Sequence, residues 1–368
     1  MLTVLLDGTG IRSQGAGKGV SRAQYEIIRR VVSSGSQFRY VIAVSEEAKA
    51  PIAAADIVIV PPGSGTYWQQ VALPRLAKRI GAKLIYTQTE VPTIWGNGVV
   101  AHAFENPLKR RAYAQETSAK QSVASVWNRL AIKRGLQRAK RVVVSSHAIR
   151  AEFQGSFGLS PESINVVPLG VDRDVFYPRV SQERESLSSE FIFHLGSDDE
   201  REATDRIVIA YKQALERDSS LPKLIIGGRM DKKRTTIQEL AANLGVSDRV
   251  ELCGWLADDD LRRYYAECIM CIHASVYEGF GLQALEALAC GASLISFPDP
   301  AVVEVVHRAA VISRGFSPAD LTEEMVKLWR EPERRSALAR EGPIRAGEFT
   351  WERTAERICA VLSGAVDD

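Results

Sequence analysis

The fold of this chain is decided by the stretch Glu278-Gly-Phe-Gly-Leu-Gln-Ala-Leu-Glu286. An apolar run typical of a strand precedes it at 268–273, and an alanine-rich run typical of a helix begins at Leu282. The stretch therefore predicts a strand, a glycine turn and a helix N-terminus, whose free N–H groups and positive dipole end bind anions. Glu278 would project from the turn, and Glu286 would follow about two helical turns later. This arrangement suits a ligand that carries both phosphates and hydroxyls.

The segment resembles the E-x7-E motif of the retaining nucleotide-sugar glycosyltransferases of family 4, which have the GT-B fold. Further stretches resemble the same family, namely 166–178, 248–255, 289–295 and 349–351. The resemblance extends over nearly the whole chain and is most specific from 165 to 306. It implies an α/β protein with two Rossmann-like, doubly wound domains that face a central cleft.

The apolar pattern itself alternates strands and helices, as in parallel α/β domains. Strands are expected at 2–7, 38–44, 56–60, 83–87, 97–102, 141–145, 191–195, 223–227, 249–252, 268–273 and 292–296. Helices are expected near 20–33, 66–80, 121–139, 203–217, 234–244, 258–266, 282–290, 318–330, 333–346 and 351–362. The resemblance implies an acceptor-binding domain at 1–168, joined by the C-terminal helix at 351–368, and a nucleotide-sugar-binding domain at 169–350.

The resemblance also implies the reaction, which is transfer of a sugar from a nucleotide-diphosphate sugar to an acceptor hydroxyl with retention and without a metal. Glu278 would hold a hydroxyl of the donor sugar, and Glu286 would accept hydrogen bonds from the ribose. The diphosphate would lie against the turn formed by Gly279, Phe280, Gly281 and Leu282, and Trp255 would flank the base. No separate cofactor is expected, because the nucleotide sugar is a co-substrate.

The loop after the strand 191–195 departs from the family pattern. Where members carry an arginine after the glycine and a lysine further on, this chain has Ser197 and Glu202, with Gly196 retained. A dianionic leaving group needs compensating positive charge. Arg201 is the first candidate for that role, and Lys18 and Arg229 are candidate helpers. The alternative for Arg201 and Arg229 is a surface position without function.

Two further candidates lie in the first half. Lys18-Gly19 occupies the place of the family's glycine loop, which faces the donor phosphates, although the spacing fits neither a Walker A loop nor G-x-G-x-x-G. His102 ends a strand where the family often has a histidine that reaches the donor sugar and the acceptor. A plain flexible loop and a hydrogen-bonded packing histidine are the alternatives. Thr89 and Glu90 are expected at the same rim.

Charge is divided unevenly along the chain. Residues 1–168 carry 22 Lys/Arg against 10 Asp/Glu, although the whole chain has a net charge of only +2. The excess is greatest at 108–150, which predicts an anionic partner such as a membrane surface or an acceptor. A solvated helical face and attraction between the domains are the alternatives. Nucleic acid is not expected, because no binding motif accompanies the charge.

The acceptor itself, whether a glycan, a lipid-linked or a small molecule, is not specified by the sequence. No apolar run approaches the ~20 residues of a membrane span, and the five cysteines lie in apolar surroundings. A cytoplasmic protein is therefore expected, and a peripheral position at the inner membrane face is the alternative that the basic segment 108–150 suggests. Two rival functions stay open: a GT-B-type sugar-nucleotide epimerase and a non-catalytic sugar-nucleotide-binding subunit.

Overall fold

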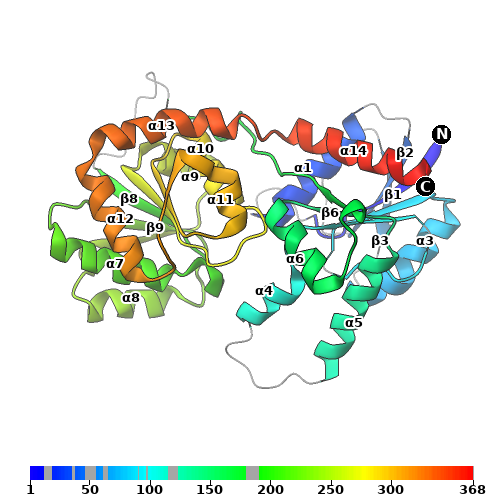
Figure 1. Cartoon of the computed structure of the whole chain (residues 1–368), viewed down its shortest axis with the longest axis horizontal. Coiled ribbons are helices and arrows are strands. Elements are labelled where there is room, and N and C mark those ends of the chain that lie inside the picture. Colours follow the sequence, from blue (N-terminus) through cyan, green and yellow to red (C-terminus); the bar gives the residue numbers. More distant parts are fainter. Residues whose placement is uncertain are drawn as a thin grey trace. The chain divides into compact units, whose positions relative to one another are not determined.

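The computed structural model describes residues 1–11, 19–34, 38–45, 55–60, 65–89, 91–96, 98–114, 123–179 and 190–367 (Figure 1). The chain divides into two compact units, which we call unit 1 (Met1–Gly170 with Thr350–Asp368) and unit 2 (Val171–Phe349). Each unit is a parallel α/β domain, as predicted. The cleft predicted between the two domains stays a prediction.

Unit 1 is built on a seven-stranded sheet with the order β3-β2-β1-β4-β5-β6-β7 among its described residues. Its strands are β1 (Leu2–Asp7), β2 (Phe38–Ser45), β3 (Asp56–Val60), β4 (Leu84–Thr87), β5 (Val99–Ala103), β6 (Arg141–Val144) and β7 (Ile164–Val166). Its helices are α1 (Val20–Ser33), α2 (Gly65–Tyr67), the π-helical η1 (Trp68–Ala72), α3 (Leu73–Arg79), α4 (Pro107–Ala114), α5 (Val123–Arg138), α6 (His147–Phe157), the short η2 (Pro161–Ser163) and α14 (Trp351–Asp367). All the strand pairs are parallel.

The central strands of unit 1 form because their residues are apolar on both faces, as a sheet covered on both sides requires, whereas the edge strand β3 is largely exposed. Val4, Leu5 and Leu6 of β1 have no exposed surface. Such burial of apolar area contributes about 25 cal/mol per Å². The sheet is therefore a rigid support for the loops at the carboxyl ends of its strands.

The last helix, α14, belongs to unit 1. It lies along α1 in Figure 1, and Arg30 Nε donates to Glu352 Oε1 at 2.7 Å. Trp351 is buried, and Thr354 Oγ1 donates to the Pro168 carbonyl at 2.8 Å. The helix runs to Asp367, beyond the predicted end at 362, because Leu362 and Ala365 are fully buried.

Unit 2 has a six-stranded sheet with the order β10-β9-β8-β11-β12-β13 in its described part. Its strands are β8 (Phe191–Leu195), β9 (Lys223–Gly227), β10 (Val250–Gly254), β11 (Met270–His273), β12 (Leu294–Ser296) and β13 (Ala310–Ile312). Its helices are η3 (Glu200–Glu202), α7 (Thr204–Arg217), α8 (Arg234–Asn243), α9 (Asp258–Glu267), α10 (Leu282–Ala289), α11 (Pro300–Val306), η4 (His307–Ala309), α12 (Pro318–Arg330) and α13 (Pro332–Ala346). In Figure 1, α7 and α8 lie on one side of the sheet and α10 and α13 on the other.

Several elements were not predicted. The edge strands β7 and β13 have three residues each, too few for a periodic signal. Helix α6 begins after Ser146, whose side chain accepts from Ile149 N, and ends at Gly158 in the left-handed region. Within the described ranges, none of the helices has the length and hydrophobicity to cross a bilayer.

Candidate functional site

The turn between β11 and α10 in unit 2 is the predicted anion site, and its backbone is fixed on both sides. Phe280 is buried and packs edge-on against Phe349 at 5.7 Å between ring centroids. Gly281 precedes α10 with φ of 95°, and a Cβ there would come within 3.0 Å of Val302. Glycine is therefore required at this position by both conformation and space. The first turn of α10 presents N–H groups that have no partner within the helix.

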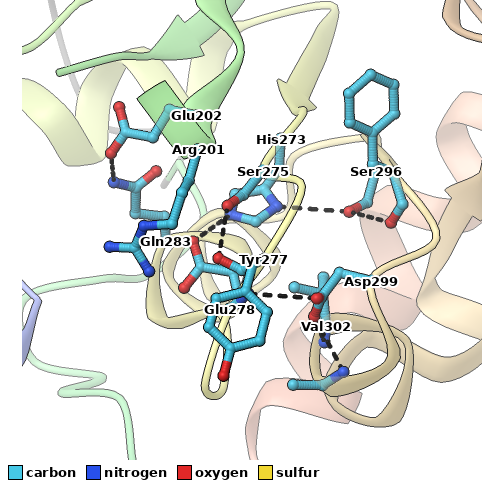
Figure 2. Close-up of polar contacts among 12 residues, drawn as sticks. Arg201, Glu202, His273, Ser275, Tyr277, Glu278, Gln283, Ser296, Asp299 and Val302 are labelled. Atoms are coloured by element: carbon cyan, nitrogen blue, oxygen red, sulfur yellow. Dashed lines mark hydrogen bonds and ion pairs between the residues drawn. The ribbon is translucent and has the colours of Figure 1, made fainter. Parts of the chain in front are cut away.

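Asp299 holds this turn in place, and the sequence analysis missed it. It is buried, and its Oδ1 caps α11 by accepting from Ala301 N at 3.0 Å and Val302 N at 3.1 Å. Its Oδ2 accepts from Glu278 N at 3.2 Å (Figure 2). One carboxylate thus ties the backbone of Glu278 to the start of another helix. An aspartate directly before Pro300 is a helix-start signal, but nothing local indicated its contact with Glu278.

Glu278 projects from the turn with 27% of its side chain exposed. Its Oε1 lies 3.8 Å from His273 Nε2. Burial lowers the pKa of His273 to about 4, and the nearby His194 contributes a smaller part of this shift. This imidazole is therefore neutral at pH 7. Glu278 therefore faces a neutral neighbour there, and its carboxylate is partly open to solvent.

Glu286 lies in α10 and is buried. Burial raises the pKa values of Tyr265 and Cys290, and the negative charge of Glu286 adds to both shifts. The structure therefore places Glu286 inside the unit, between α9 and the end of its own helix. This position is compatible with the predicted ribose contact but does not test it.

The loop from Gly196 to Ala203 lies beside the Glu278 turn. Val276 N donates to the Arg201 carbonyl at 2.8 Å, which joins the two segments. The guanidinium of Arg201 bonds Asp199 through Nε to Oδ1 at 3.0 Å and through Nη2 to Oδ2 at 2.6 Å. The predicted phosphate ligand is thus already neutralised in part by a carboxylate two residues away.

Glu202, next to it, extends toward α10. Gln283 Nε2 donates to its Oε1 at 3.3 Å (Figure 2), whereas Oε2 is buried and has no hydrogen-bond partner among the described residues. Burial raises the pKa of Glu202 to about 7. The Ser197 hydroxyl and the Gln283 amide act against this shift, and Asp199 adds to it.

The other donor-site candidates of unit 2 are Arg229 and Trp255, which are exposed, and Gly196, which is buried. Arg229 is exposed, and its Nε donates to Asp231 at 2.6 Å. Trp255 is 55% exposed, directly after β10. Gly196 follows β8 in a closely packed position, since a Cβ on Gly228 would come within 1.9 Å of its carbonyl oxygen. Glycine at 228 therefore allows the β8 and β9 loops to approach each other.

Unit 1 has a pocket of about 310 Å³ at the carboxyl ends of β1, β4 and β5. Its wall combines apolar residues such as Trp68 and Phe104 with several polar side chains: Asp7, Thr9, Gln24, Gln69, Gln88, Thr89, His102, Glu105 and Arg110. Asp7 is buried and accepts from Trp68 Nε1 at 3.0 Å, from Gln69 Nε2 and from Thr87 Oγ1 at 3.2 Å. These three donors come from segments more than 60 residues away, so no local sequence pattern indicated the cluster.

His102 lies on this wall and contacts Tyr86 through its Nδ1. Gln88 Nε2 donates to Tyr86 Oη at 3.3 Å, and Tyr86 Oη lies 2.6 Å from His102 Nδ1. If the tyrosine proton points to Nδ1, the imidazole proton lies on Nε2. His102 Nε2 is buried and lacks a protein partner in the described part of the chain. Burial lowers the pKa of His102 to about 3, so the ring is a neutral N–H donor.

Two of the predicted positions cannot be placed. Lys18 and Glu90 lie outside the described residues. Gly19 is described, with φ of 66° directly before α1. Among the residues that the structure covers, no three His, Cys, Asp or Glu side chains come together as metal ligands.

Comparison with known families covers most of the chain. Residues 17–175 match the family Glycosyltransferase Family 4, and residues 180–345 match the family Glycosyl transferases group 1. The MMP alpha-(1->4)-mannosyltransferase of Mycolicibacterium hassiacum is 30% identical over 239 residues, which cover 64% of this chain and 56% of that protein. The chain spans about half the length of the curated relatives it matches.

Solved structures support the fold. The sucrose-phosphate synthase of Thermosynechococcus elongatus superposes with a TM-score of 0.79 at 17% identity and covers 99% of both chains. Anabaena HepE in complex with UDP superposes with a TM-score of 0.75 at 15% identity, covering 99% of this chain and 100% of that one. At these identities the likeness concerns the fold, which is GT-B.

Proposed function

We propose that this chain, a member of the family 4 glycosyltransferases, moves a sugar from a nucleotide-diphosphate sugar to an acceptor hydroxyl. Its first half matches Glycosyltransferase Family 4, and its second half matches Glycosyl transferases group 1. The observation that carries this proposal is the fixed turn at Glu278, with α10 beginning directly after it. A carboxylate and a row of free N–H groups then lie together, as a ligand with hydroxyls and phosphates requires. The complex of Anabaena HepE with UDP adds support for a nucleotide ligand.

In this proposal, Glu278 binds a hydroxyl of the donor sugar and stabilises positive charge that develops at the reacting carbon. Its backbone is held by Asp299, so the carboxylate needs little reorganisation when charge appears. Glu286 accepts hydrogen bonds from the ribose, and Trp255 flanks the base. The leaving phosphate takes the acceptor proton, and the anomeric configuration is retained.

We propose further that no metal is required. The N-terminus of α10 supplies positive potential. Arg201 remains the first candidate for the cation that contacts the diphosphate, although its guanidinium also bonds the Asp199 carboxylate. The acceptor would bind in the unit 1 pocket, where the His102 Nε2–H donates to an oxygen. A polar wall of amides and acids fits the hydroxyls of a sugar or a cyclitol, whether free or part of a larger acceptor.

Contact with an anionic membrane remains part of the proposal. Lys109 pairs with Glu152 at 2.8 Å, and Arg110 pairs with Glu105 at 3.1 Å. These ion pairs reduce the charge that α4 offers to a lipid surface. A reducing compartment for the five free cysteines remains part of the proposal. Cosedimentation with anionic vesicles at low and high salt tests the contact. The proposal predicts that the protein binds the vesicles at low salt and is released at high salt.

The test of the function is an assay of nucleotide sugars (UDP-, GDP-, ADP- and dTDP-linked) with and without a panel of hydroxyl acceptors. The proposal predicts that donor is consumed only when acceptor is present. Consumption of donor alone, with formation of an isomer, would favour an epimerase. Tight binding without any transfer would favour a binding subunit. Glu278→Gln is the matched variant, expected to bind donor and to lose transfer.

A further inference from the structure

The carboxyl of Glu202 has an environment that differs from every other acid described in the site. It extends from η3 to the first turn of α10, where Gln283 Nε2 donates to its Oε1 at 3.3 Å. Its second oxygen, Oε2, is buried without a partner among the residues described. A buried carboxylate oxygen without a donor is costly, whereas a carboxyl group can place its proton there and become a donor itself. The geometry therefore favours a protonated carboxyl whose O–H donates a hydrogen bond to an acceptor atom of a ligand.

The Ser197 hydroxyl and the Gln283 amide both act to lower the pKa of Glu202, but burial outweighs them. The charged groups nearby are engaged elsewhere. Arg201 on the same short helix bonds both oxygens of Asp199. Lys233 lies directly before α8. Its Nζ pairs with Glu200 at 3.0 Å and also donates to the Asp199 carbonyl. Other titratable groups on the packed elements are Asp198, whose Oδ1 accepts from two backbone N–H groups, Glu278 on the turn and the buried Glu286 of α10. The imidazoles of His194 and His273 both have pKa values lowered by burial to about 4.

The position of Glu202 relates it to the proposed ligand. Gln283 is the second residue of α10, so the Glu202 carboxyl lies beside the helix end that would receive a diphosphate. An ionised carboxylate there would repel the phosphate, because like charges that share a poorly solvated site raise each other's energy. A neutral carboxyl would instead donate one hydrogen bond to a phosphate oxygen.

We propose that Glu202 is a donor-binding residue that acts in its protonated form, giving a hydrogen bond from its carboxyl to a diphosphate oxygen of the nucleotide sugar. The inference rests on the proposed function, because the diphosphate is the ligand that this function supplies. Binding of the donor then includes uptake of one proton above the pH at which Glu202 ionises. Burial raises the pKa of Glu202 to about 7, which places that change near neutral pH. Donor affinity should fall by up to about tenfold per pH unit above pH 7 and level off below it.

The experiment is isothermal titration of the full chain with the UDP-, GDP-, ADP- and dTDP-sugars at pH 6, 7, 8 and 9. These donors are phosphodiesters whose own phosphates do not ionise in this range. The proposal predicts an affinity that falls above pH 7. At pH 8 the binding heat should change with the ionisation enthalpy of the buffer, in proportion to an uptake of up to one proton.

Two variants make the test specific. Glu202→Gln keeps the shape and the acceptor for Gln283 and offers an N–H donor at every pH, so its affinity should be flat and at least about tenfold above wild type at pH 9. Glu200→Gln is the matched control, since it removes an exposed carboxylate from the same short helix, and it should keep the wild-type slope. A flat wild-type profile, or equal slopes in wild type and Glu202→Gln, would overturn the role of Glu202 and leave the proposed function standing. Failure of every donor to bind at pH 6 would contradict both.

Discussion

The ends of β1 in unit 1 and of β8 in unit 2 invite comparison, because the two strands occupy the same place in sheets of matching order. A buried carboxyl oxygen lies at or shortly after each end, of Asp7 in one unit and of Glu202 in the other. Asp7 accepts hydrogen bonds from Trp68, Gln69 and Thr87. Glu202 receives one from Gln283. In the same architecture, Asp7 thus accepts hydrogen bonds from its own unit, whereas Glu202 is left with an oxygen that a ligand would contact.

The difference teaches how burial acts on an acid. Donors that the protein itself supplies satisfy the oxygens of a carboxylate, and removing the acid then leaves those donors unsatisfied. Where the donors are too few, burial favours the protonated form, and the acid opposes folding once it is ionised. Substitution of the two acids should therefore have opposite effects on stability.

The largest effect is expected for Asp7→Ala. This change leaves an indole N–H, an amide and a hydroxyl buried without their acceptor, at about 1–3 kcal/mol for each unsatisfied group. We expect the free energy of unfolding to fall by roughly 3 kcal/mol, measured by urea denaturation at pH 7. Asp56→Asn is the control, because Asp56 is an exposed partner of Arg39 and should change stability by less than about 0.5 kcal/mol. Equal effects of the two changes would remove the structural role of Asp7.

Glu286→Ala tests the buried acid of α10. Loss of its ribose contacts should weaken nucleotide binding by roughly 1–3 kcal/mol, the cost of leaving buried polar partners unpaired. Titration of the variant with the nucleoside diphosphate of the preferred donor measures this change. An unchanged dissociation constant would exclude Glu286 from the nucleotide site.

Glu202→Gln should raise stability, but only at higher pH. The folded-state pKa is about 7, against an ordinary value of 4.5, so the folded form binds the proton more tightly than the unfolded form. The cost of ionisation is absent below about pH 4.5, grows up to about pH 7 and is constant beyond. Because a tenfold change in proton affinity corresponds to about 1.4 kcal/mol, we expect a gain on the order of 2 kcal/mol at pH 8 and almost none at pH 4. Thermal melting of both proteins at the two pH values measures it, and a gain that is independent of pH would contradict the account.

His102→Phe is expected to have the smallest effect of the four. It keeps the ring packing against Phe104 and removes one N–H donor to the acceptor, which should lower kcat/KM by about five- to tenfold. Because the pKa of His102 is about 3, the wild-type rate should show no histidine titration between pH 5 and 8 that the variant lacks. A titration near pH 6.5 that disappears in the variant would show that the imidazole ionises in the site.

The sequence predicted what depends on local pattern. The strand before Glu278 and the helix after Gly281 follow from apolar runs and glycine chemistry, and the structure has both. What it did not predict depends on distant contacts. Asp299 reaches Glu278 across 21 positions, and Trp68 reaches Asp7 across 61.

Arg201 shows a different limit of sequence reasoning. Its charge suggested a phosphate ligand, but the short helix η3 folds it back onto Asp199, two residues before it. Composition cannot reveal such a pairing, because it depends on one local turn. The predicted role of Arg201 therefore depends on whether a diphosphate displaces Asp199.

The central claim is that the chain transfers sugar from a nucleotide-diphosphate donor, with the protein and not a metal supporting the diphosphate. Time-resolved NMR of donor, acceptor panel and full chain in excess EDTA tests it most directly. The account predicts that the donor is consumed only with acceptor, that the product keeps the donor's anomeric configuration, and that EDTA leaves the rate unchanged. Consumption without acceptor, inverted product, or activity that needs added magnesium or manganese would contradict it.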